Sequence, residues 1–204
     1  MKFNQSQEKA IKHKDGPMLL LAGPGSGKTT VLTHRIQYMI REYGIAPEHI
    51  LVITFTKAAA GEMKERFRKL CPGVSGVTFG TFHSVFFWML RNAYNYTGAN
   101  IVTDSEKYDV IRESIDRHGF RYDSQEDFAR NVLGEIGVVK SEMRRLEEYN
   151  STTMKSDDFR VVYTEYENFL RKSGKIDFDD MLVFTYELLS QRTDILNMWR
   201  RKFQ

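Results

Sequence analysis

Three short, continuous apolar runs mark the first 85 residues and predict β-strands over residues 17–22, 50–55 and 77–81. Continuous apolar character, without alternation, is typical of strands covered on both faces, as in a parallel α/β sheet. Residues 29–43 and 58–70 place apolar positions at helical spacing, and each stretch ends at a glycine or proline that stops a helix. The order strand, helix, strand, helix, strand predicts a βαβαβ unit.

The pattern changes after residue 85. Residues 86–175 show helical periods and no convincing strand, with breaks at 96–100, 118–119 and 150–153. We therefore expect residues 1–85 to begin an α/β domain and residues 86–175 to form an all-helical insertion. Residues 176–204 would return the chain to the first domain as one or two amphipathic helices.

Composition narrows the class of protein. The 204 residues are 41% hydrophobic and 13% aromatic with a net charge of +3, which excludes a mainly disordered chain. One cysteine, Cys71, excludes a disulfide framework and a Cys-rich zinc site. The chain contains neither the ~20-residue apolar run that a membrane span needs nor the apolar core of a signal peptide. A soluble, cytoplasmic protein is expected.

The charge is distributed unevenly. Residues 1–85 carry 12 Lys and Arg against 6 Asp and Glu, whereas residues 86–204 carry 18 against 21. A basic first segment suits an anionic partner such as a nucleotide or nucleic acid. An ordinary solvated surface explains the same excess, so the motifs must decide between these interpretations.

The most specific motif reads Ala-Gly-Pro-Gly-Ser-Gly-Lys-Thr over residues 22–29 and fits the P-loop pattern, with Ala22 at the first glycine position. The glycines allow a tight turn whose amide groups surround phosphate oxygens. Lys28 would supply positive charge to the β- and γ-phosphates, and the Thr29 hydroxyl would coordinate Mg²⁺. An apolar run before the loop and an amphipathic helix after it support nucleotide binding.

Nucleotide hydrolysis also needs a Walker B carboxylate at the end of a strand, and we find none in this sequence. The Val161–Glu165 stretch lies in a helical pattern. Asp177 and Asp180 follow no strand and are expected to cap and charge the first turn of a helix over residues 181–189. The catalytic set is therefore incomplete.

Five motifs in order make the chain similar to the N-terminal part of superfamily 1A DNA helicases of the UvrD/Rep/PcrA type. Residues 3–7 (Phe-Asn-Gln-Ser-Gln) resemble the Q motif, and residues 23–30 resemble helicase motif I. Residues 53–63 resemble motif Ia, and residues 80–84 (Gly-Thr-Phe-His-Ser) resemble the next DNA-contact motif. Residues 176–182 resemble the segment that returns the chain from the helical 1B subdomain to the RecA-like 1A subdomain.

The resemblance implies an α/β fold: a P-loop RecA-like parallel sheet flanked by helices, an incomplete 1A subdomain, with an all-helical 1B insertion. It implies ATP and Mg²⁺ as cofactors, with Gln7 reading the adenine edge. The implied nucleotide-binding set is Gln7, Ala22, Gly23, Pro24, Gly25, Ser26, Gly27, Lys28, Thr29 and Thr30, of which Lys28 and Thr29 are catalytic and Thr29 holds the metal. Thr30 stands where many members carry an arginine that stacks on adenine.

For DNA, the resemblance implies that Phe55 stacks on a base and that Thr56, Lys57, Thr81 and His83 contact the sugar–phosphate backbone. Lys57 replaces the usual asparagine, and Ala58 follows where lysine is common. His83 taken alone would be a structural histidine, and its motif favours DNA instead. Phe82 is expected in the core, because it leads into the apolar run over residues 85–87.

The family's Walker B strand begins just after the position that matches the end of this chain. The resemblance therefore implies a piece of an ATP-dependent 3′–5′ helicase that moves along single-stranded DNA and acts at single-strand/duplex junctions. A second RecA-like domain of the same parent chain would complete the motor. The chain alone is expected to bind Mg-ATP weakly and not to unwind DNA. Two alternatives remain: a nucleic-acid- or partner-binding module with a structural P-loop, and a small P-loop kinase.

Overall fold

The computed structural model describes residues 2–120 and 125–203 and divides the chain into two compact units. The first unit comprises residues 1–85 and 192–204, and the second comprises residues 86–191. The division falls within one helix, α4 (Phe82–Tyr94). The assignment of these parts to 1A and 1B subdomains stays a prediction.

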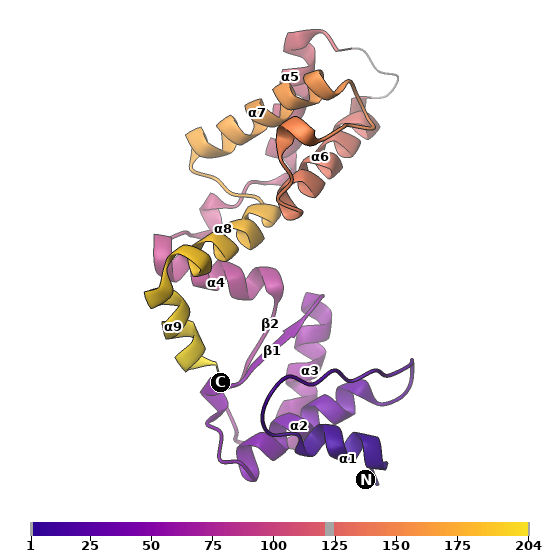
Figure 1. Cartoon of the computed structure of the whole chain (residues 1–204), viewed down its shortest axis with the longest axis vertical. Helices are drawn as coiled ribbons and strands as arrows, with labels where there is room; N and C mark the ends of the chain where they lie inside the picture. Colours follow the sequence, from indigo (N-terminus) through magenta and orange to yellow (C-terminus); the bar gives the residue numbers. More distant parts are fainter. Residues whose placement is uncertain (1, 121–124, 204) are drawn as a thin grey trace. The chain divides into compact units, whose positions relative to one another are not determined.

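A parallel pair of strands lies at the centre of the first unit (Figure 1). Strand β1 (Leu51–Thr54) pairs with β2 (Thr78–Thr81), with Leu51 opposite Thr78 and Thr54 opposite Thr81. Helix α3 (Lys57–Leu70) connects the two strands. Buried Ile36, Ile50, Phe67 and Cys71 form the core beside the pair. The expected second and third strands are thus present.

The expected first strand is wrong, because residues 17–22 form no strand in the described structure. Leu20 packs into a small core with Ala10, Ile11 and Val31, while Leu19 and Leu21 are each 84% exposed. The alternation of half-buried Leu20 with the exposed leucines suits an extended segment that lacks a strand partner. A full RecA-like sheet is therefore not observed; the described sheet has two strands.

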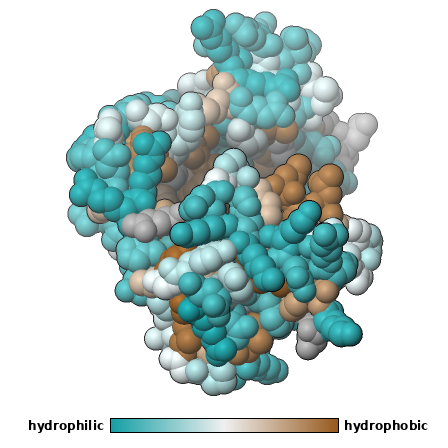
Figure 2. All heavy atoms as spheres, turned by 60° about the horizontal axis from the view of Figure 1, so that its bottom comes forward, coloured by the Kyte–Doolittle hydropathy of each residue, from teal (hydrophilic) through white to brown (hydrophobic). Residues whose placement is uncertain are grey.

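Helices α1 (Gln5–Lys12) and α2 (Lys28–Arg41) pack together against this segment. Arg35 of α2 donates hydrogen bonds to the carbonyl oxygens of Ala10 (2.8 Å) and His13 (2.5 Å), which fixes the end of α1. Figure 2 shows a mainly hydrophilic surface interrupted by separate hydrophobic areas. The most exposed leucines, Leu19 and Leu21, belong to this unit.

The last residues of the chain return to the first unit. Helix α9 (Thr193–Lys202) lies against the 3₁₀ turn η1 (Pro47–His49) and buries Trp199. The His49 ring nitrogen Nδ1 lies 2.7 Å from the Lys202 carbonyl oxygen. The tail therefore forms two helices, α8 (Phe178–Gln191) in the second unit and α9 in the first.

The second unit is built from helices. It continues α4 and contains η2 (Gly98–Asn100), α5 (Asp104–His118), α6 (Gln125–Ser141), η3 (Leu146–Glu148), α7 (Ser156–Ser173) and α8 (Phe178–Gln191). Its core gathers fully buried side chains from α5, α6 and α7, including Ile111, Val132 and Phe159. Among its described residues, Ile101 and Ile176 form an isolated parallel β-bridge. The helical prediction is confirmed for the described residues.

Asp177 and Asp180 cap the start of α8, as the sequence predicts. The Asp177 amide donates to Asp180 Oδ2 (2.9 Å), and the Asp180 amide donates to Asp177 Oδ1 (2.8 Å). Such reciprocal bonds satisfy two amides that a helix N-terminus leaves without intrahelical partners. The helix begins at Phe178, three residues earlier than expected.

The same two carboxylates surround a buried lysine, which the sequence analysis missed. Lys140 Nζ lies 2.6 Å from Asp180 Oδ1, 2.7 Å from Asp177 Oδ2 and 2.9 Å from Glu167 Oε1, and its side chain is 4% exposed. Burial raises the pKa of Asp180 to about 6, against the opposing effect of Lys140. Burial also works against the charge of Lys140, yet the carboxylates raise its pKa above the ordinary value. This cluster joins α6, α7 and the start of α8.

None of the helices in the described part of the chain has the length and apolar character to cross a membrane.

Replacing the buried lysine should destabilise the second unit. Lys140→Met leaves two buried carboxylates without their cation, and we expect it to lower the free energy of unfolding by about 3–5 kcal/mol. Their pKa values in the folded variant should then lie above those in the unfolded chain, so the folded state takes up protons as the pH falls. The loss in free energy of unfolding relative to wild type should therefore be larger at pH 8 than at pH 5. Urea unfolding at both pH values would measure it.

The matched control is Lys172→Met, which removes an exposed lysine from the same unit and should change stability by less than about 0.5 kcal/mol. If Lys140→Met lowers the free energy of unfolding only slightly, or equally at both pH values, Lys140 does not stabilise the buried carboxylates.

Candidate nucleotide and nucleic-acid sites

The P-loop adopts a tight turn that leads directly into α2. Gly25 and Gly27 have φ values of 71° and 81°, a region that disfavours residues with a Cβ atom. Gly27 precedes the first residue of α2, Lys28, and its carbonyl accepts the amide of Val31 at 2.9 Å. Glycines at these two positions are therefore required by the backbone itself.

Lys28 folds back over the loop. Its Nζ donates to the carbonyl oxygens of Ala22 (3.0 Å) and Gly23 (2.9 Å), and the Ser26 hydroxyl donates to the same Gly23 oxygen (2.7 Å). The ammonium group is thus held over the loop at the N-terminus of a 14-residue helix. Both features favour a bound anion.

Gln7 connects α1 to the P-loop. Asn4 and Gln7 form a capping box, in which Gln7 Oε1 accepts the Asn4 amide at 3.0 Å. The other end of the same side chain, Nε2, donates to the Ser26 carbonyl at 3.1 Å. The side chain therefore lies directly beside the loop, and its expected contact with adenine stays a prediction.

A cavity of about 230 Å³ brings several of the expected nucleotide residues together. The expected residues that line it are Gln7, Ala22, Gly23, Ser26 and Lys28, together with Asn4, Ser6, Leu20, Leu21 and Val31. Pro24, Gly25, Gly27, Thr29 and Thr30 are not among its lining residues.

The chemistry of this site fits a nucleotide phosphate. The lining residues offer one ammonium group, two hydroxyl groups and a helix N-terminus to an anion, and no carboxylate is among them. Thr29, the second residue of α2, is half-buried, and its carbonyl accepts the Thr33 hydroxyl. Within the described residues no group of three or more His, Cys, Asp or Glu side chains could hold a metal ion. The role of Thr29 as a metal ligand stays a prediction.

The expected DNA-contact residues lie where β1 and β2 end. Phe55 follows β1 and is 92% exposed, and Thr56 and Lys57 begin α3 directly after it. Thr81 is the last residue of β2, and half-buried His83 lies in the first turn of α4. Because the strands are parallel and adjacent, their carboxyl ends meet at one edge. Ligands of open α/β sheets bind at this edge.

The two threonines act as helix caps. Thr56 Oγ1 accepts the Ala59 amide at 3.1 Å at the start of α3. At the start of α4, the Thr81 amide donates to Ser84 Oγ (2.8 Å) and the Ser84 amide donates to Thr81 Oγ1 (3.2 Å). These bonds fix the backbone on both sides of the strand edge. A backbone contact with DNA would come in addition to these structural roles.

A groove of about 400 Å³ runs between α3 and the end of β2. Its lining residues are Lys57, Ala60, Gly61, Lys64, Phe79, Gly80, Thr81 and Ser84. Lys57 and Lys64 lie seven residues apart on one face of α3, with Gly61 between them. The groove therefore offers two cations, two hydroxyl groups and no carboxylate to a ligand.

Sequence reasoning missed three residues of this edge. Lys64 lines the groove with Lys57, and its spacing of two helical turns was the available signal. Ser84 caps α4. Phe82, expected in the core, is 41% exposed, and its ring lies edge-on to that of Phe55 with centroids 6.0 Å apart. The expectation for Phe82 was wrong because it begins α4 at the strand edge, ahead of the turn in which Val85 is buried.

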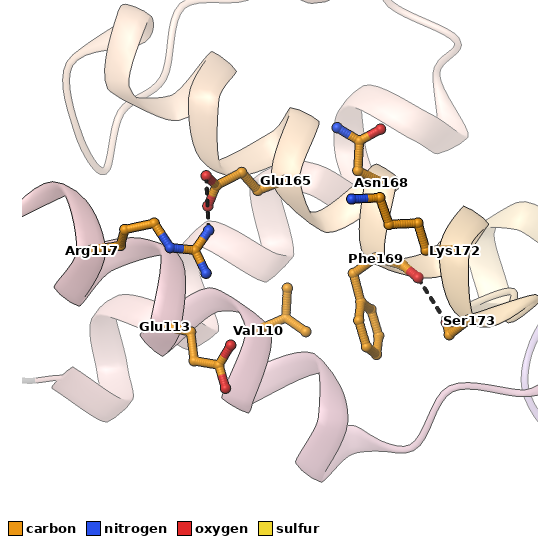
Figure 3. A pocket seen from close by; sticks show the side chains of 8 residues that line it. All are labelled: Val110, Glu113, Arg117, Glu165, Asn168, Phe169, Lys172 and Ser173. Carbon is orange, nitrogen blue, oxygen red and sulfur yellow. Dashed lines mark hydrogen bonds and ion pairs between the residues drawn. The ribbon is translucent and has the colours of Figure 1, made fainter.

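A further cavity of about 560 Å³ lies in the second unit between α5 and α7 (Figure 3). Val110 and Phe169 supply its apolar side chains, and Arg117 pairs with Glu165 at 3.1 Å. Both acidic and basic groups surround it, so it shows no preference for one sign of charge. None of the residues selected from the sequence lines this cavity.

Replacing two glycines of the groove by alanine should have opposite effects on the stability of the chain. A Cβ on Gly80 would lie 2.7 Å from Ser84 Oγ and 3.1 Å from Val85 Cγ2, whereas a Cβ on Gly61 meets no atom within 4 Å. We expect Gly80→Ala to lower stability by about 1–3 kcal/mol through overpacking. Gly61→Ala, at an exposed helical position, should raise it by about 0.5–1 kcal/mol. Thermal and urea unfolding of both variants would test this, and equal effects would contradict the close packing at Gly80.

The chain resembles proteins of known class along its length. A family profile described as the UvrD/REP helicase N-terminal domain matches residues 3–204. The chain is 38% identical over 209 residues to the ATP-dependent DNA helicase PcrA of Bacillus subtilis (strain 168). It is 34% identical over 209 residues to the PcrA of Staphylococcus aureus (strain Mu50 / ATCC 700699) and 32% identical over 213 residues to that of Leuconostoc citreum.

Each of these alignments covers 99% of this chain and 28% of the relative, so the chain spans little more than a quarter of the length of the curated relatives it matches. The family profile, in contrast, is matched from residue 3 to residue 204, across both compact units. The chain belongs to the UvrD/Rep helicase family, and its residues correspond to the N-terminal domain of that family.

Proposed function

We propose that this chain is the nucleotide-binding N-terminal part of an ATP-dependent DNA helicase that moves 3′ to 5′ along single-stranded DNA. Residues 1–85 form the first part of a RecA-like 1A subdomain, residues 86–175 form the 1B subdomain, and residues 176–204 return toward 1A. The observation that carries the proposal is the P-loop beside Gln7, in a chain whose family is that of UvrD/Rep helicases.

In the nucleotide site, the loop of residues 22–27 and Lys28 hold the phosphates, Thr29 holds Mg²⁺, and Gln7 reads the adenine. Bound Mg-ATP supplies the phosphoryl chemistry that drives movement in such motors. The support is the cavity shared by Gln7 and Lys28 and its lack of lining carboxylates. Thr30 carries no group that stacks on a base, so base recognition would come from Gln7 or from other groups of the site.

In the nucleic-acid site, Phe55 stacks on a base while Thr56, Lys57, Thr81 and His83 contact the backbone, and Lys64 adds a second cation. The support is their common position at the strand edge and the groove there, which Lys57 and Lys64 help to line. The residues of the first unit carry 16 Lys and Arg against 7 Asp and Glu, whereas those of the second carry 14 against 20. This distribution favours a DNA track on the first unit.

Removing the P-loop lysine should abolish most nucleotide binding. We expect Lys28→Ala to weaken Mg-ATP binding at least tenfold, because a charge-assisted contact to phosphate is lost. Fluorescence titration with a labelled ATP analogue and ATP-dependent thermal stabilisation would measure this. Phosphate release from Mg-ATP by the unmodified chain should stay at background, with and without single-stranded DNA.

Lys9→Ala, which removes an exposed lysine of α1, should leave nucleotide affinity unchanged. Unaltered affinity in Lys28→Ala would contradict the nucleotide site. Turnover that DNA stimulates and Lys28→Ala abolishes would contradict the incomplete catalytic set and would require a metal carboxylate within this chain.

The two groove lysines should contribute separately to DNA binding. We expect Lys57→Ala and Lys64→Ala each to weaken oligo-dT binding and to reduce the salt slope of log K by about 0.7, the value for one phosphate contact on a single strand. Fluorescence anisotropy over a range of salt concentrations measures both. Lys69→Ala, at the far end of α3, is the matched control and should leave the slope unchanged. Equal slopes in all three variants would contradict a phosphate contact in the groove.

A further inference from the structure

The register of the two strands brings a second aromatic ring to the proposed base-stacking residue. Thr54 of β1 lies opposite Thr81 of β2, so the next residues along each strand, Phe55 and Phe82, leave the sheet side by side. Their ring centroids are 6.0 Å apart with an interplanar angle of 64°. This edge-to-face arrangement is the one that aromatic pairs favour.

The two rings differ in how firmly they are held. Phe55 is 92% exposed, so almost all of its ring surface faces water, whereas Phe82 is 41% exposed. Phe82 is the first residue of α4, and the reciprocal Thr81–Ser84 bonds fix its backbone. A side chain as exposed as Phe55 must lose rotamer freedom before it can stack on a base, unless a neighbour restricts it first.

We propose that Phe82 is a positioning residue, which holds the Phe55 ring edge-on so that an open face remains for a nucleobase. The proposal rests on the proposed function, in which Phe55 stacks on single-stranded DNA. Phe82 then contributes to affinity through Phe55 and not by its own contact with the nucleic acid. Its effect should depend on the bases of the ligand and should vanish when Phe55 is absent.

A double-mutant cycle on the 204-residue chain separates these roles. Anisotropy would measure binding of a labelled oligo-dT and of an abasic oligonucleotide of the same length, at low salt. The variants are Phe55→Ala, Phe82→Ala and the double variant, with Phe82→Leu to keep apolar volume and Phe82→Tyr to restore a ring. Phe178→Ala, which removes a 49% exposed phenylalanine of the second unit, is the matched control.

We expect Phe82→Ala and Phe82→Leu to weaken oligo-dT binding by roughly three- to tenfold, the range of an edge-to-face aromatic pair. Phe82→Tyr should restore it. The loss should disappear in the Phe55→Ala background and on the abasic oligonucleotide, neither of which allows base stacking on Phe55. Phe178→Ala should bind both ligands as wild type does. If Phe82→Ala does not fold, as judged by circular dichroism, Phe82→Leu carries the test.

Three results would overturn the positioning role. They are unchanged oligo-dT binding in both Phe82→Ala and Phe82→Leu, an equal loss on abasic DNA, and a loss that persists without Phe55. The last would make Phe82 a stacking residue in its own right. A failure of the proposed function looks different, because the wild-type chain itself would then bind oligo-dT no better than abasic DNA.

Discussion

The parallel pairing of β1 with β2 determines what the first unit can present to a ligand. With Thr54 opposite Thr81, both strands end at the same level, and α3 and α4 begin directly beyond them. The exposed rings, the capping threonines and the lysines of α3 therefore share one edge. A shift of one residue in this register would separate Phe55 from Phe82 and turn alternate side chains to the other face.

Features that depend on neighbouring residues in the chain could be predicted from the sequence. Glycines at 25 and 27, the helix after the P-loop and the cap at Asp177 each depend on a few neighbouring residues, and both helices begin within three residues of their expected starts. The prediction of a strand over residues 17–22 was wrong because a strand depends on residues far away in the chain. A strand exists only with a hydrogen-bonding partner, and an apolar run does not reveal whether that partner is present.

The buried charge of Lys140 could not be predicted from the sequence. Lys140 occupies one position of a helical pattern, and nothing near it in sequence indicates that Glu167, Asp177 and Asp180 surround it. The sequence predicts that Asp177 and Asp180 cap a helix. This prediction is right but incomplete, because each carboxylate is bonded both to the helix N-terminus and to Lys140. One cluster thus joins three helices through contacts 27 to 40 residues apart in the chain.

The bonds of Lys28 also bear on how a nucleotide enters. In this structure two of the three N–H groups of the ammonium are already bonded, to the carbonyl oxygens of Ala22 and Gly23. A phosphate that bound here would compete with the loop for these two N–H groups. Binding is an exchange of partners, and its free energy is the difference between two sets of hydrogen bonds. The loop proposed to hold the phosphate would thus also compete with it, and a change that loosens the loop carbonyls should alter nucleotide affinity without touching the nucleotide.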